Sequence, residues 1–264
     1  MTRSQPALKL AHSPLVLALA QVKISPVLQM QEYVPGIQER LRRDGFPHFR
    51  ENVVQEVRFG PEIKTSARQR WVFSNKAQTE TVVLASDFVA LECSRYDVFE
   101  DFIGRLERLL ETVRNEVEVA LSDRIGLRYI DLVRPKADES LSDYLKPGLS
   151  GLPASEIGAE RALHRFESIA NTNVGQLVLR VLQTNDGTFL PPGLDPSDLK
   201  FDVQIGEGEI LTILDIDHYS MQDRDFDPPD LIQEFWKLHD VTDRVFRFAV
   251  TDHAMRRWEA KERA

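Results

Sequence analysis

The chain has 264 residues, of which 42% are hydrophobic and 28% are charged, and its formal net charge at pH 7 is -9. This composition is typical of a globular protein with a substantial core. The acidic balance disfavours broad, non-specific nucleic-acid binding, which requires a basic surface, but it still permits a local basic patch.

The one cysteine, Cys93, excludes an intramolecular disulfide. The apolar run nearest the N-terminus, at 15–20, is far shorter than a membrane span, and no small-residue cleavage site of a signal peptide follows it. We therefore expect a cytoplasmic protein with no membrane partner.

The first half of the chain predicts a strand, a helix, four strands and a second helix. The first strand is almost entirely apolar and ends before Pro26, and the first helix places Tyr33, Ile37 and Leu41 on one stripe before Gly45 ends it. The predicted ranges are strand 15–24, helix 29–44, strands 52–59, 68–74, 79–85 and 88–94, and helix 101–119.

The second half begins with the central segment 123–135, which carries apolar side chains on both faces of a strand, as a covered strand would. Asn185-Asp186-Gly187 is a hairpin-type turn signal, and an irregular, proline-rich loop follows at 190–200. The other predicted elements are a short helical turn at 140–145, strands at 163–170, 176–183 and 209–217, and helices at 228–247 and 251–258.

These patterns predict an α+β fold with an antiparallel sheet, helices on one face, and two similar β-α-β(3-4)-α halves in tandem. The segment 91–96 (LECSRY) can be laid over 214–219 (LDIDHY), and a long helix follows each. We expect a loose arm at 1–13 and halves at 14–121 and 122–264, with both long helices on the same face. The alternative is two unrelated α+β lobes.

This order of elements resembles the TATA-binding-protein-like architecture, in which two such halves form one curved sheet backed by helices. The resemblance concerns the order alone, so no residue that contacts nucleic acid carries over from it.

Three segments, 17–26, 124–131 (RIGLRYID) and 214–219, resemble a sporadically distributed family of uncharacterised prokaryotic proteins of about this length. The likeness covers most of the chain, and the central block is its most specific part. The family's patchy distribution implies horizontal gene transfer and a defence or mobile-element context, but the resemblance implies no activity.

Arg124 and Arg128 share one face of the central strand, with Gly126 between them. Two guanidinium groups so placed could bind a carboxylate or phosphate, and glycine leaves room for a close approach. The alternative is ion pairing within the protein, because an arginine in a covered strand must meet a carboxylate or line a cavity. The candidate partners of Arg128 are Glu92, Asp131 and Asp215.

Asp215 and Asp217 share one face of a predicted strand, and His239 lies on the following helix. Two carboxylates and an imidazole could hold a metal ion or act as an acid and a base. The alternative is an ordinary strand end with a core-facing histidine that bonds to a backbone or carboxylate group.

The sequence contains no phosphate-binding loop, dinucleotide fingerprint, nucleophile elbow or zinc-type Cys/His spacing, and it identifies no cofactor. We therefore expect a non-enzymatic binding or interaction protein, with a protein partner or a second copy of the chain as its partner. The alternative is a metal-dependent hydrolase or nuclease that uses Asp215, Asp217 and His239.

Overall fold

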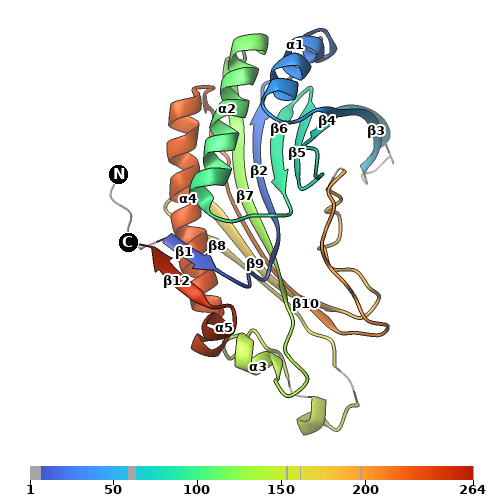
Figure 1. The fold of residues 1–264 in the computed structure, drawn as a ribbon, viewed down its shortest axis with the longest axis vertical. Coiled ribbons are helices and arrows are strands. Elements are labelled where there is room, and N and C mark those ends of the chain that lie inside the picture. The colour runs from blue at the N-terminus through green and yellow to red at the C-terminus, as the bar shows by residue number, and fades with distance from the viewer. Residues whose placement is uncertain (1–6, 59–63, 153, 161, 197, 264) are drawn as a thin grey trace.

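The computed structural model describes residues 7–58, 64–152, 154–160, 162–196 and 198–263. Its main feature is a ten-stranded antiparallel sheet in the order β3-β4-β5-β6-β2-β7-β10-β9-β8, with β11 paired to β7. The long helices lie on one face of this sheet (Figure 1). The predicted α+β class with an antiparallel sheet is confirmed.

The first half follows the predicted order of elements. A central strand leads into a helix, four further strands form one side of the sheet, and a long helix returns over it. The elements are β2 (Leu15–Ile24), α1 (Met30–Arg43), β3 (His48–Arg58), β4 (Lys64–Ser74), β5 (Glu80–Ala85), β6 (Phe88–Cys93) and α2 (Phe99–Val117).

The second half also keeps the predicted order, and it adds short elements that the sequence patterns did not indicate. The elements are β7 (Leu121–Val133), α3 (Leu141–Tyr144), the 3-10 helix η1 (Ala154–Ile157), β8 (Arg165–Asn171), β9 (Gln176–Thr184), β10 (Leu211–Ser220), β11 (Arg224–Asp225), α4 (Pro228–Ala249), α5 (Asp252–Arg257) and β12 (Ala260–Arg263).

The N-terminal segment differs from the prediction. Residues Ala7–Leu10 form β1, which pairs antiparallel with β12 in a separate two-stranded sheet. The backbone N–H of His12 also donates to the carbonyl of Trp258. The predicted loose arm is therefore wrong for this part of 1–13, because backbone pairing fixes it to the C-terminal end of the chain; residues 1–6 lie outside the described residues.

The centre of the sheet is the antiparallel pair β2 and β7. From this centre outward, the first half runs β2, β6, β5, β4, β3 and the second half runs β7, β10, β9, β8. In each half the first strand therefore pairs with the last, and the other strands follow in reverse order. A duplicated origin of the halves stays a prediction.

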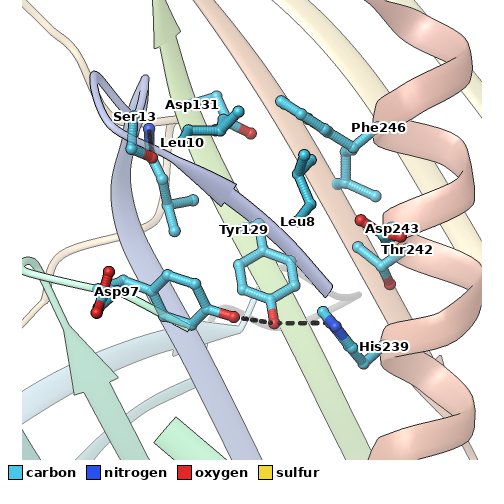
Figure 2. Close-up of a pocket in the computed structure, with 13 residues that line it drawn as sticks. Leu8, Leu10, Ser13, Asp97, Tyr129, Asp131, His239, Thr242, Asp243 and Phe246 are labelled. Carbon is cyan, nitrogen blue, oxygen red and sulfur yellow. Dashed lines mark hydrogen bonds between the residues drawn. The ribbon is translucent and has the colours of Figure 1, made fainter. Parts of the chain in front are cut away.

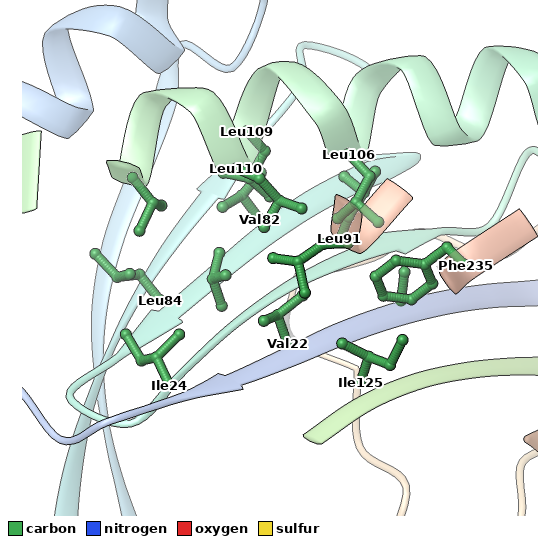
Figure 3. Packing of buried hydrophobic residues seen from close by; sticks show 14 of the residues in the cluster. Val22, Ile24, Val82, Leu84, Leu91, Leu106, Leu109, Leu110, Ile125 and Phe235 are labelled. Carbon is green, nitrogen blue, oxygen red and sulfur yellow. The ribbon is translucent and has the colours of Figure 1, made fainter. Parts of the chain in front are cut away.

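The main core lies between the sheet and the helices. In α2, buried apolar residues recur every three or four positions, as in Phe102, Leu106 and Val113, so one stripe of the helix faces the sheet. Figure 3 shows Leu106 of α2 and Phe235 of α4 in the same cluster as residues of the strands. Both long helices thus cover the same face, as predicted.

The opposite face, which we call the open face, is covered only in part. The loop at 185–210 crosses it, and Leu199 and Phe201 pack on Leu17, Ile130 and other apolar side chains of the sheet. The backbone N–H of Lys200 donates to the carbonyl of Gln78, which ties the loop to the first half (Figure 1).

The predicted hairpin turn at Asn185-Asp186-Gly187 opens this long loop instead of a tight hairpin. β9 and β10 do pair antiparallel, but the chain first makes the excursion over the open face. The apolar residues of the loop, which local turn signals do not report, account for the detour because they bury part of the sheet. Among the described residues, no helix combines the length and apolar character needed to cross a bilayer.

Candidate functional site

A cavity of about 400 Å³ lies on the open face, next to the crossing loop. Four strands of the second half form its floor, and the loop contributes two prolines. Its lining residues are Arg128, Arg165, Glu167, Arg180, Leu182, Thr184, Pro191, Pro192 and Asp217.

Strand register explains why charged side chains meet there. Glu167 of β8 lies opposite Arg180 of β9, and Arg180 lies opposite Asp215 of β10. Directly opposed residues of neighbouring strands project from the same face of a sheet, so the three form a row across it. Arg128 of β7 lies opposite Asp217, two residues farther along β10, and so approaches the row diagonally.

Asp215 is the anchor of this row, because its carboxylate is fully buried and accepts bonds from two arginines. Arg128 donates through Nε to Oδ1 at 2.8 Å and through Nη2 to Oδ2 at 2.7 Å. Arg180 donates through Nη1 to Oδ2 at 3.2 Å and also pairs with Glu167. Of the three partners considered for Arg128, the structure places Asp215 in contact with it.

The arginines keep donors for the cavity. A guanidinium group has five N–H donors, and Arg128 and Arg180 each use two in the bonds above, which leaves about three on each. Arg165 is exposed and forms no ion pair with any residue that the structure describes. The cavity therefore combines two fixed arginines with one that is free to adjust.

Asp217 is the acidic group of the cavity that has no hydrogen-bond partner among the described residues. Burial raises the pKa of its carboxyl, while Arg128 and Arg124 act in the opposite direction. A ligand with a hydrogen-bond donor beside its acidic group would meet both kinds of side chain here.

Arg124 does not join Arg128 in the cavity. Its Nη1 donates to Oε1 of Gln21 at 2.9 Å, and its guanidinium carbon lies 4.6 Å from the centre of the Tyr219 ring. A Cβ atom at Gly126 would lie 3.0 Å from this Nη1, so the glycine makes room for the side chain of Arg124. The two arginines share a face but take part in different contacts.

The predicted metal triad is not assembled. Asp215 and Asp217 face the open side, whereas His239 of α4 lies on the helix side, stacked on Phe99 at a centroid distance of 3.8 Å. The Nδ1 atom of His239 lies 3.2 Å from the hydroxyl of Tyr129. No group of three His, Cys, Asp or Glu side chains in the described part of the chain could hold a metal ion.

Sequence reasoning missed Arg165, Glu167 and Arg180. The signal for Arg180 was available, because it is the one charged residue of the apolar strand β9, as Arg128 is a charged residue in the covered strand β7. Arg165 and Glu167 lie on the exposed strand β8, where charged side chains give no such signal.

Comparison with protein-family models, curated proteins and solved structures found no match. The resemblance to the sporadically distributed prokaryotic family therefore stays a prediction, and the functional argument depends on the cavity itself.

Proposed function

We propose that the protein is a cytoplasmic binding protein whose open-face cavity receives a ligand that bears a carboxylate or phosphate group. The observation that carries this proposal is that Arg128 lines the cavity while only two of its five donors are used in the pair with buried Asp215. Planar guanidinium groups match carboxylate and phosphate oxygens in two-bond geometry, which favours such a ligand.

Rigidity supports a binding role for these arginines. A long, free side chain loses rotamer freedom when it binds a ligand, and this loss weakens affinity. Arg128 and Arg180 are already held by Asp215, so the fold has fixed their guanidinium groups before any ligand arrives. Asp215 also neutralises part of their charge, so shape and donor geometry matter more than net charge in this site.

A second polar cavity of about 350 Å³ lies on the other side of the crossing loop. Lys23, Arg68 and Arg70 line it, together with Asp87 and Glu92. The Nε atom of Arg70 is buried and has no hydrogen-bond partner in the described part of the chain. A ligand that extends beyond one acidic group, such as a segment of a protein partner, could contact both this cavity and the open-face cavity across the loop.

The hydrolase alternative has less support. Both carboxylate oxygens of Asp215 accept bonds from arginine, so they are engaged before a metal ion could approach. His239 lies on the other side of the sheet from Asp217. A metal mechanism would therefore need residues other than these three.

The proposal predicts a thermal shift with anions. Phosphate, sulfate, nucleotides and small carboxylates at about ten-millimolar concentration should be compared at constant ionic strength. A ligand at roughly ten times its dissociation constant stabilises a protein by about 1.4 kcal/mol, which corresponds to about 2–4 °C for a chain of this size. No shift with any member of the panel would count against the cavity as an anion site.

A further inference from the structure

A third, smaller cavity of about 80 Å³ lies on the helix side of the sheet, between β1, β7 and α4. Figure 2 shows Asp131 near one end, and Tyr129 and His239 at the other. Leu8 and Leu10 of β1 form part of its wall. Strand alternation separates this cavity from the open face, because Tyr129 and Asp131 point away from Arg128.

Asp131 is the unusual group in this cavity. It is only 3% exposed, and it forms no hydrogen bond or ion pair with any residue that the structure describes. A buried carboxylate without a partner is costly, and most native carboxylates avoid this state by pairing. The fold thus directs into this cavity an acid that has no partner among the described residues.

Aromatic and acidic side chains form part of the remaining wall, beside Ser13, Leu15, Ile216, His239 and Thr242. The hydroxyls of Tyr96 and Tyr129 lie 3.5 Å apart, their rings meet edge to face with centroids 5.7 Å apart, and Phe246 lines the same space. Asp243 adds a second carboxylate, which also pairs with Arg247. Aromatic faces and carboxylates both attract cations, so the lining favours a positively charged guest.

We propose that this cavity binds a small organic ammonium ion, with the Asp131 carboxylate as its ion-pair partner and Tyr96, Tyr129 and Phe246 as its aromatic walls. The volume sets the size of the ligand. A cavity measured with a water-sized probe needs about 10–15 Å³ to hold one water molecule, so this one has room for an ion of a few heavy atoms, such as methylammonium or ethylammonium.

Binding should be coupled to a proton. Burial, with a smaller contribution from Asp215, raises the pKa of Asp131 to about 8. The acid is therefore mostly neutral at pH 6.5, and a cation must displace its proton. The ionisable groups that surround it are Tyr96, Asp97, Tyr129, Asp215, His239 and Asp243.

Calorimetric titration of the full chain with methylammonium and ethylammonium tests this inference. At pH 8.5 we expect saturable binding, weaker by about tenfold or more at pH 6.5 because the ionised fraction of Asp131 falls. Methanol and ethanol, which match these ions in size without the charge, should not bind. Asp131→Asn should abolish binding, whereas Asp97→Asn at the cavity rim should retain it.

Carbon-13 NMR of the Asp131 carboxyl in the unaltered protein gives a second readout that needs no variant. Saturating methylammonium should lower its pKa, because the cation stabilises the ionised form. An unchanged pKa, absence of binding at pH 8.5, or equal affinity in folded Asp131→Asn would each overturn the inference. Because this cavity and the open-face cavity use different residues, failure here leaves the proposed function unaffected.

Discussion

Replacing Asp215 with asparagine should lower the free energy of unfolding by about 2–4 kcal/mol, one of the largest effects expected of any single substitution in this chain. The carboxylate is fully buried and is the shared partner of Arg128 and Arg180. Asparagine keeps the shape but removes the charge, so two guanidinium groups lose their partner. Their side chains are 19% and 26% exposed, and access to water makes the loss smaller than for a fully buried pair. Denaturant unfolding at pH 7 measures it.

Asp217→Asn is the matched control, because it lies on the same strand and face but has no ion pair among the described residues. Its stability should stay within about 1 kcal/mol of the parent, the range of ordinary substitutions. Equal losses for the two variants would contradict the anchoring role of Asp215.

Pairwise replacement separates the charge effect from packing. Arg128→Met with Asp215→Leu removes both charges while keeping the methylene packing at 128 and the branched shape at 215, so it should recover part of the stability that Asp215→Asn loses. Arg180 still has Glu167 in this variant. Arg128→Met alone should be better tolerated than Arg128→Ala, because methionine keeps the methylene packing.

Replacing Asp131 with asparagine should raise the free energy of unfolding, whereas Asp215→Asn should lower it. Burial raises the folded-state pKa from 3.8 to about 8, so the folded protein holds a proton between these values that the unfolded chain releases. Stability from this group is fully present below pH 3.8 and is lost as the pH rises toward 8. The loss has an upper bound of about 6 kcal/mol, at about 1.4 kcal/mol for each unit of pKa.

Asparagine does not titrate, so its advantage over the parent should be small near pH 4 and reach several kcal/mol at pH 8 to 9. Unfolding curves of both proteins across this range provide the comparison. An advantage that stays constant with pH would mean that Asp131 is ionised throughout and has found a partner.

Much of the fold could be predicted because its long elements have strong periodic patterns. The stripe of Phe102, Leu106 and Val113 predicted the helix α2, and the two apolar faces of 123–135 indicated a covered strand. The pairing of β1 with β12 was not visible, because it joins the two ends of the chain through backbone bonds that need no particular side chains.

The site was predictable only where burial forced a pairing. A charged residue in a covered strand needs a partner, and on this basis Asp215 was one of three candidate partners of Arg128, with Glu92 and Asp131. The sequence could not show that Arg124 lies outside the cavity that Arg128 lines, because the contacts of Arg124 depend on where Gln21 and Tyr219 lie. Strand alternation grouped Asp215 with Asp217, but it does not say which face the helices cover, so His239 could not be excluded from their side.

The most direct test of the account is a calorimetric titration of the open-face cavity with the anion that gives the largest thermal shift. Arg165→Met is the informative variant, since Arg165 lines the cavity and is exposed, so its loss should not affect folding. Arg134→Met is the control, because Arg134 is also exposed but pairs with Glu209 outside the cavity lining. We expect Arg165→Met to weaken binding by roughly tenfold to a hundredfold, in line with about 1.5–3 kcal/mol for a hydrogen bond to a charged group, while Arg134→Met leaves it unchanged. Equal affinities in the parent and Arg165→Met would contradict the account.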